Sequence, residues 1–284
     1  EKKTALDIYQ AIQIIRRKPD IIVSFSERIG IPIGALIRNR KDRPKHIVIA
    51  HRLDTRPKKI LSELTSWNQG LDRLIVLCSS QMNDAKNYTK NKSKYLKACV
   101  TDDKFWMPND TEEEYFLSVG AESRDYITLL KAARINKLPL KIVAQSPWSR
   151  KEANKQDDIP KNVEFLPKLE YSILLSLYQK AKAIVVPLKR VTYAAGHNGV
   201  LEGICTAKPM IVSDSPGIMD YVCNKKNALV VEAYNPALLS EAMILLNTDK
   251  SLCNSLAFNC RQMVVDGFNL DQYINELCEL TKLI

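Results

Sequence analysis

Residues 183–203 read AIVVPLKRVTYAAGHNGVLEG, and this stretch decides the fold class of the chain. It begins with consecutive apolar residues, which is typical of a strand buried on both faces of a parallel sheet. A loop containing Gly196 and Gly199 follows and opens a helix that carries Glu202. Glycine lets the backbone approach a ligand and free N–H groups at a helix start favour an anion, so the loop is a candidate phosphate site. The alternative is a loop with ordinary turn glycines and a solvated Glu202.

Short apolar runs alternate with helical stretches on both sides of this segment. Strands separated by helices in this way predict an α/β fold with parallel sheets. Asn235 followed by Pro236 marks one helix start, because Pro is favoured at the first helical position. Further helices are expected at residues 126–133, 173–181 and 273–281. The expected strands are residues 21–25, 46–50, 73–78, 95–100, 115–119, 140–144, 163–166, 183–187, 209–213 and 228–231.

Two domains are expected. Residues 106–114 are poor in apolar side chains, charged and interrupted by Pro108, so we place a linker there and a boundary near residue 110. Residues 111–284 then form a complete alternating α/β domain. Residues 1–110 open on a helix that leads into the strand at Ile21, whereas a doubly wound domain begins on a strand. This order predicts that the N-terminal domain lacks its first strands.

Composition and charge exclude several classes of protein. The 284 residues are 45% hydrophobic and 26% charged and include only 9 Gly, which argues against a disordered or collagen-like chain. No run approaches the roughly 18 apolar residues of a membrane-spanning helix. The formal net charge is +10, and its excess belongs to residues 1–108, with 22 Lys and Arg against 11 Asp and Glu. The excess indicates an anionic partner for the first domain.

No pattern of metal ligands is found. Seven cysteines occur without a CxxC pair, which indicates reduced cytosolic thiols rather than a disulfide framework or a zinc site. No Asp-x-Asp is present, and we expect neither a metal nor a cofactor. The P-loop, the dinucleotide fingerprint and the serine hydrolase elbow are also missing from the sequence. The chain begins at Glu1 without a signal region or initiator Met, which indicates processing or a fragment.

Basic residues of the first domain gather around two loops that are predicted to follow strands. One interpretation is a solvated surface. The others are attraction to an anionic membrane surface or contact with an anionic acceptor. Nucleic acid is disfavoured, because no recognised binding motif accompanies the charge. The residues are Arg38, Arg40, Lys41, Arg43, Lys45, Arg52, Arg56, Lys58 and Lys59.

The chain has three histidines. His46 opens a strand and is expected to be structural. His51 follows the strand that ends at Ala50, and ligands bind at the carboxyl ends of parallel strands. A loop histidine without a task is an equal alternative for His51. His197 lies in the glycine loop and is the stronger candidate for function.

The ordered series from Val163 to Leu246 resembles the donor-binding half of GT-B glycosyltransferases of family 4, the group 1 glycosyl transferases. The likeness extends back to Ser118, covers most of residues 115–284 and is weaker in residues 1–108. It implies two Rossmann-like domains facing a cleft, with a nucleotide diphosphate sugar held mainly by the C-terminal domain. The matching features after the strand ending at Pro187 are the glycine loop, Glu202, Ala207-Lys208-Pro209, Pro216-Gly217, Asp220 and residues 227–231.

The resemblance implies roles for single residues. Glu202 matches the second Glu of the family's Glu-x7-Glu motif, which implies hydrogen bonds to the donor ribose. The first Glu falls at Ala194 and is missing, so that His197 or amides of the loop would contact the transferred sugar. Arg124 matches the basic residue that neutralises the donor diphosphate together with the helix start after Gly196. The alternative for Arg124 is a surface ion pair with a neighbouring acidic residue, Glu122 or Asp125.

Two further residues follow from the resemblance. Asp220 stands where the family often has Glu after a Pro-Gly turn, and a carboxylate at a helix start is its alternative reading. His51 is similar to a histidine at the cleft edge of the acceptor half, which implies contact with the donor sugar or the acceptor. The expected catalytic residues are His51 and His197, and the expected donor-binding residues are Arg124, Gly196, His197, Asn198, Gly199, Glu202 and Asp220.

The function implied is a retaining, metal-independent glycosyltransferase of the hexosyltransferase kind. It would move a sugar from a nucleotide diphosphate sugar to a glycan, a lipid-linked or a small-molecule acceptor held over residues 1–110. A nucleotide-sugar epimerase is the enzymatic alternative, and a non-catalytic nucleotide-sugar-binding or scaffold protein is the other, encouraged by the missing Glu. The expected location is the cytoplasm, with peripheral attachment to a membrane through the basic domain.

Overall fold

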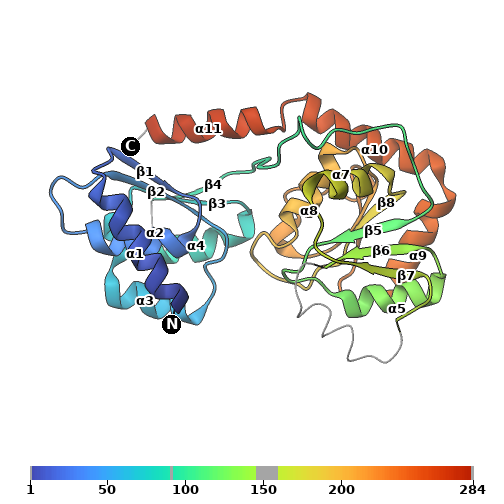
Figure 1. Cartoon of the computed structure of the whole chain (residues 1–284), viewed down its shortest axis with the longest axis horizontal. Coiled ribbons are helices and arrows are strands. Elements are labelled where there is room, and N and C mark those ends of the chain that lie inside the picture. The colour runs from blue at the N-terminus through green and yellow to red at the C-terminus, as the bar shows by residue number, and fades with distance from the viewer. Residues whose placement is uncertain (1, 90–91, 145–158, 283–284) are drawn as a thin grey trace. The chain divides into compact units, whose positions relative to one another are not determined.

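The computed structural model describes residues 2–89, 92–144 and 159–282. The chain divides into two compact units. Unit 1 comprises Glu1–Lys97, Thr192–Ala194 and Asn275–Ile284, and unit 2 comprises Ala98–Val191 and Ala195–Ile274. Each unit is a parallel sheet with helices packed on it (Figure 1). The α/β class and the two parallel-sheet domains expected from the sequence are therefore confirmed.

The boundary between the two units falls after Lys97, which is earlier in the chain than the position near residue 110 that the sequence indicates. The reason is the segment that follows Lys97, which packs on unit 2. Trp106 is only 5% exposed, and its ring meets the ring of Tyr178 edge-on at a centroid distance of 5.2 Å. The stretch that resembles a linker in composition is thus fastened to unit 2 at this point.

Unit 1 contains sheet A, whose four parallel strands follow one another in the order β1-β2-β3-β4. Its strands are β1 (Ile21–Ser24), β2 (Lys45–Ala50), β3 (Arg73–Val76) and β4 (Ser93–Tyr95). The first three lie where apolar runs predict them. The strand expected at residues 95–100 is misplaced, because β4 ends at Tyr95 and Ala98 already belongs to unit 2. The helices are α1 (Lys2–Arg16), α2 (Glu27–Ile37), α3 (Arg56–Thr65) and α4 (Met82–Thr89), with short 3-10 helices η1 (Trp67–Gly70) and η2 (Ser79–Gln81).

The core of unit 1 explains the role of one histidine. His46 is fully buried in β2, where Nδ1 donates to the carbonyl of Gly70 (3.2 Å) and Nε2 lies 3.0 Å from Oγ of Ser24. Burial lowers the pKa of His46 to about 4, so the ring stays neutral. The structural role expected for His46 is confirmed.

Unit 2 contains sheet B, whose six parallel strands have the order β10-β9-β8-β5-β6-β7. The strand order reverses between β5 and β8, and in doubly wound sheets ligands bind beyond the carboxyl ends of the strands at such a reversal. The strands are β5 (Phe116–Val119), β6 (Leu140–Val143), β7 (Val163–Leu166), β8 (Ala183–Val186), β9 (Met210–Ser213) and β10 (Leu229–Val231). The helices are α5 (Tyr126–Asn136), α7 (Tyr171–Lys180), α8 (His197–Cys205), α9 (Pro236–Thr248) and α10 (Lys250–Val265), with the 3-10 helix η4 (Pro216–Ile218). Helix α11 (Leu270–Lys282) begins in unit 2, and from Asn275 on it belongs to unit 1.

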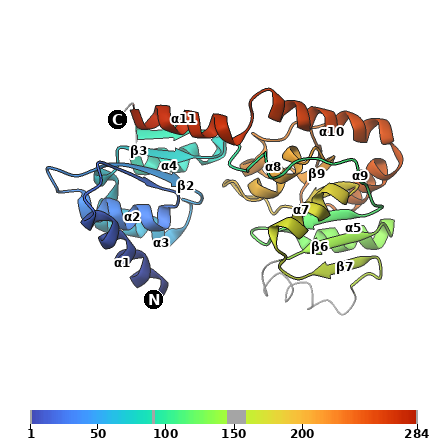
Figure 2. The ribbon, with the colours of Figure 1, turned by 45° about the horizontal axis from the view of Figure 1, so that its top comes forward.

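The interior of unit 2 follows from the alternation of side chains along its strands. Phe116, Ile142 and Val185 point to one face, where they pack with residues of α5 and α9. Every residue of β8 is at most 2% exposed, as consecutive apolar residues predict for a strand covered on both sides. Figure 2 shows helices on the two sides of this sheet. Helix α10, which packs on α8, has no counterpart among the helices expected from the sequence.

Candidate functional site

The candidate site lies at the reversal of strand order in sheet B. Arg124 comes from the loop after β5, and helix α8 begins after the loop that follows β8. The two loops are hydrogen-bonded to each other, since Asp125 N donates to the carbonyl of Pro187 and Lys189 N donates to the carbonyl of Ser123, both at 2.9 Å. Residues separated by more than 60 positions in the chain are thus held at one edge of the sheet.

The guanidinium of Arg124 is buried and fixed in place. The residue is 7% exposed, and it donates to the carbonyl of Val119 from Nε (3.1 Å) and Nη2 (2.9 Å) and to the carbonyl of Glu122 from Nη1 (3.1 Å). The alternative reading of Arg124, a surface ion pair, is wrong because the side chain is not at the surface. The carboxylate of Asp125 instead caps α5 by accepting from the backbone N–H of Thr128 (3.1 Å).

Two glycines make room for this guanidinium. A Cβ at Gly120, whose φ is +110°, would lie 2.7 Å from Nη2 of Arg124, so only glycine suits both the backbone and the space. A Cβ at Gly199 would lie 3.3 Å from the same atom. Gly199 stands in the first turn of α8, so the guanidinium lies against the start of that helix. A positive charge and a helix start converge there, which suits a phosphate group.

Helix α8 begins as the sequence predicts. Gly196 is its N-cap residue with φ +82° and has no side chain to occupy the N–H groups of the first turn. The backbone amides of Asn198 and Gly199 are therefore candidate donors to an anion. The ring of His197 is turned into the protein, with the residue 6% exposed and its centroid 4.4 Å from that of Tyr221. The catalytic role of His197 stays a prediction.

Glu202 lies further along α8 and is fixed by a neighbour. The hydroxyl of Tyr178, which is fully buried in α7, donates to Oε2 of Glu202 at 2.7 Å. Burial raises the pKa of Glu202 to about 7, although the hydrogen bond from Tyr178 and the charge of Arg124 act in the opposite direction. A solvated Glu202, the alternative reading, is wrong because the carboxylate is hydrogen-bonded and largely covered.

Tyr178 was not anticipated as a site residue. The sequence places it at an apolar position of a helical repeat, where it reads as core. The signal that was available is its hydroxyl, because a buried tyrosine usually finds a hydrogen-bond partner.

Asp220 follows the 3-10 helix η4 and is partly exposed at the same edge of the sheet. Its alternative reading, a carboxylate at a helix start, is wrong because η4 precedes it. Its role in donor binding stays a prediction. A second carboxylate, Asp214, is not among the site residues expected from the sequence. It follows β9 and accepts from the backbone N–H of Ala233 and from Nη1 of Arg190, both at 2.8 Å.

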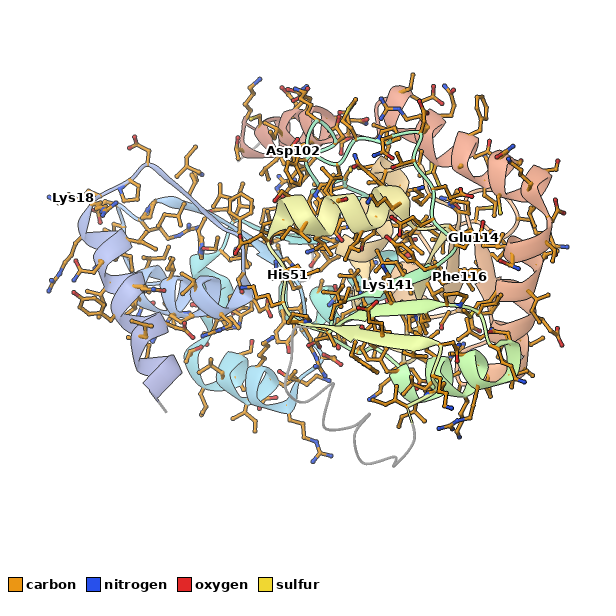
Figure 3. All side chains as sticks on the ribbon, turned by 45° about the vertical axis from the view of Figure 1, so that its right-hand side comes forward. Lys18, His51, Asp102, Glu114, Phe116 and Lys141 are labelled. Atoms are coloured by element: carbon orange, nitrogen blue, oxygen red, sulfur yellow. The ribbon has the colours of Figure 1, made fainter. Side chains whose placement is uncertain are left out.

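His51 belongs to unit 1, directly after β2 (Figure 3). The residue is exposed, and Nε2 donates to the carbonyl of Phe25 at 2.9 Å, which fixes the ring orientation. Its backbone N–H donates to Oε2 of the buried Glu27 at 2.9 Å. Among the described strands of sheet A the order does not reverse, so strand order by itself marks no crevice at His51.

The nine basic residues expected around two loops of unit 1 fall into two groups, one at each end of β2. Those from residues 38–43 precede β2 and Lys45 is its first residue, whereas those from residues 52–59 follow it. They therefore lie at opposite ends of a six-residue strand, which is about 20 Å long. Several are also neutralised, since Arg43 pairs with Asp72 at 2.6 Å and Lys58 pairs with Glu27 at 2.6 Å. The expectation that all nine lie around two strand-following loops is wrong.

Within the described ranges no group of three or more His, Cys, Asp and Glu side chains is arranged to hold a metal ion. All seven cysteines lie in those ranges and form no disulfide. In the same part of the chain, no helix combines the length and the apolarity needed to cross a membrane.

The chain resembles known proteins in sequence and in fold. The family model of the glycosyl transferases group 1 matches residues 101–263. The chain therefore belongs to the group 1 glycosyl transferases. No curated protein sequence matches it.

Solved structures share the fold of the whole chain. Sucrose-phosphate synthase from Thermosynechococcus elongatus superposes with a TM-score of 0.80 at 17% identity, over 96% of this chain and 76% of that one. HepE of Anabaena, crystallised in complex with UDP, gives 0.80 at 12% identity, over 96% and 82%. A glycosyltransferase from Rickettsia africae gives 0.74 at 12% identity, over 99% and 80%. At these identities the likeness shows the fold, which is GT-B.

Proposed function

We propose that this glycosyltransferase takes a sugar from a nucleotide diphosphate sugar bound by unit 2 and transfers it with retention of the anomeric configuration. The observation that carries the proposal is the contact of the buried Arg124 guanidinium with the first turn of α8 at the reversal of strand order. The complexes of Anabaena HepE with UDP and with UDP-glucose support a donor of this class.

The donor site would work without a metal ion. The diphosphate would accept hydrogen bonds from Arg124 and from the amides of Asn198 and Gly199. As the bond to the sugar breaks, negative charge grows on the departing diphosphate, and donors already in place stabilise that charge. Glu202, oriented by Tyr178, would accept hydrogen bonds from the ribose hydroxyls. Asp220 is the further candidate for a donor contact at the same edge.

Unit 1 would bind the acceptor. We propose that His51 contacts the transferred sugar or the acceptor, because its ring is exposed and held by the carbonyl of Phe25 at the carboxyl end of the sheet. The acceptor class is a glycan, a lipid-linked sugar acceptor or a small molecule. His197 contributes to the donor site through its backbone at the start of α8.

A second candidate is a nucleotide-sugar-binding protein without catalysis. It is favoured by Ala194, which replaces the first Glu of the family motif. A nucleotide-sugar epimerase is the remaining alternative, and it would act without any acceptor.

Turnover separates these functions. The intact chain is incubated with UDP-, GDP- and dTDP-sugars, and the release of the nucleoside diphosphate and the configuration of the product are followed by NMR. Release with retention at the anomeric carbon supports the proposal. Inversion at that carbon contradicts the retaining mechanism, an epimerised sugar nucleotide identifies an epimerase, and binding without turnover identifies a non-catalytic protein.

A further inference from the structure

Helix α3 of unit 1 turns its aliphatic side chains to the solvent. Ile60, Leu61 and Leu64 are 56%, 39% and 78% exposed. Leu64 lies four residues after Ile60 and three after Leu61, and these spacings place the three side chains along one face of the helix. An amphipathic helix of a folded domain normally buries this face. In α3 the apolar face is the outer one, and we call these three residues the α3 stripe.

The inner face of α3 is polar, and it fixes the orientation of the helix. Nζ of Lys58 donates to Oε1 of Glu27 at 2.6 Å and also to the carbonyl of Arg52. Glu27 is 4% exposed and accepts a second hydrogen bond from the backbone of His51. Burial alone would raise the pKa of Glu27, but these hydrogen bonds hold it below its usual value, so the carboxylate is charged. Rotating the α3 stripe inward would break this buried ion pair.

Cations accompany the α3 stripe. Arg56 and Lys59 are exposed on the same helix, and Glu63 is the acidic side chain of its exposed surface. Aliphatic side chains beside Lys and Arg on a surface helix are the chemistry of helices that lie in the interface of an anionic bilayer. The charge therefore selects an anionic lipid surface as the occupant.

We propose that α3 docks unit 1 on an anionic bilayer, with the α3 stripe inserted among the acyl chains near the headgroups and with Arg56 and Lys59 on the lipid phosphates. This inference is independent of the donor site in unit 2. It assigns membrane attachment to one helix, in place of the diffuse basic surface that the sequence indicated.

The test is flotation of the intact chain with vesicles of phosphatidylcholine alone and of phosphatidylcholine mixed with phosphatidylglycerol. The chain should float with the mixed vesicles only. The double variant Ile60→Ser/Leu64→Ser should bind the mixed vesicles at least about tenfold more weakly than the wild type does. The double variant Arg56→Gln/Lys59→Gln should reduce both the binding and its dependence on salt. Ile135→Ser is the matched control, since Ile135 in α5 is 58% exposed, and it should bind as the wild type does.

Three results of the flotation experiment overturn the proposal. They are no flotation of the wild type at low salt, equal flotation with neutral vesicles, and full binding by Ile60→Ser/Leu64→Ser. A wild-type dimer that this variant converts to a monomer would also overturn it, because the α3 stripe would then be covered by a second copy. Thermal melts should agree among all variants, since the side chains are exposed. Nucleotide-sugar binding by the double variant should be unchanged, which keeps this test separate from that of the donor site.

Discussion

The hydroxyl of Tyr178 donates a 2.7 Å hydrogen bond to Oε2 of Glu202. Tyr178 is itself held by Trp106, whose ring lies edge-on at 5.2 Å with an angle of 77° between the rings. The carboxylate proposed to bind the ribose is therefore oriented before any donor arrives. Preorganisation of this kind reduces the cost of ordering the site on binding.

Donor affinity should rise with pH between about 6 and 8, because Glu202 loses its proton near pH 7. An ionised carboxylate accepts hydrogen bonds from ribose more strongly than a carboxylic acid does. The charged or titratable groups that act on Glu202 are Arg124 and Tyr178. Calorimetry with a nucleotide sugar across this range measures the effect, and Glu202→Gln should give a flat profile. A flat profile for the wild type would contradict the assigned role.

The free energy of unfolding should fall as the pH rises from the ordinary pKa of Glu202 to its pKa in the folded state. The pKa of Glu202 is about 7 in the folded state against 4.5 as its ordinary value. The folded state thus keeps the proton to higher pH, and the free energy of unfolding falls by about 3 kcal/mol as the pH rises from 4.5 through 7. Urea unfolding of the wild type and of Glu202→Gln at several pH values isolates this contribution. Identical pH dependence in the two proteins would refute it.

Tyr178→Phe should shift the pH profile of donor binding upward. The hydrogen bond from Tyr178 lowers the pKa of Glu202, so its loss raises that pKa further. The ring is kept, so the contact with Trp106 persists, and the stability should fall by about 1–3 kcal/mol. A tyrosine that served packing alone would leave the midpoint of the profile where it is in the wild type.

Gly199→Ala should weaken the binding of UDP, GDP or dTDP by about tenfold. The new Cβ would lie 3.3 Å from Nη2 of Arg124, which the carbonyl of Val119 holds in place, so the guanidinium or the helix start must shift. Alanine favours the helix by about 0.5–1 kcal/mol over glycine, so the thermal midpoint should not fall. Unaltered nucleotide affinity would show that this contact does not form part of the site.

Lys58→Ala should destabilise the protein by about 3 kcal/mol, because it leaves the buried carboxylate of Glu27 without its cation. The pKa of Glu27 is lowered in the folded state, so its contribution is present above the ordinary pKa and is lost as the pH falls through the folded value. Urea unfolding at neutral and acidic pH measures both effects. The double variant Glu27→Gln/Lys58→Ala should recover part of the loss, and no recovery would contradict the pairing.

The strands of both sheets were predictable where apolar residues follow one another. Residues 183–186 are the clearest case, since a strand covered on both faces has no polar position. β4 was not predictable in the same way, because Ser93 and Lys94 give an edge strand no apolar run. The resemblance identified Arg124 and Glu202 from the order of motifs, and the structure adds that both lie at the reversal of strand order.

Other features needed the three-dimensional structure. Tyr178 reads as a core residue because the sequence does not show which group its hydroxyl meets. The basic residues on either side of β2 are close in the chain, but the strand between them carries them to opposite ends of the sheet. The outward orientation of the α3 stripe was likewise hidden, because it depends on the ion pair of Lys58 with Glu27.

The most direct test of the donor site is calorimetry of the intact chain against UDP-, GDP- and dTDP-sugars, repeated with Glu202→Ala and Arg124→Ala. At least one donor class should bind, and each variant should weaken that binding by about tenfold or more, because each removes a charged hydrogen-bonding partner of the donor. Circular dichroism of each variant confirms that it is folded. No binding to any donor, or unchanged affinity in both folded variants, would contradict a nucleotide-sugar site at Arg124, the start of α8 and Glu202.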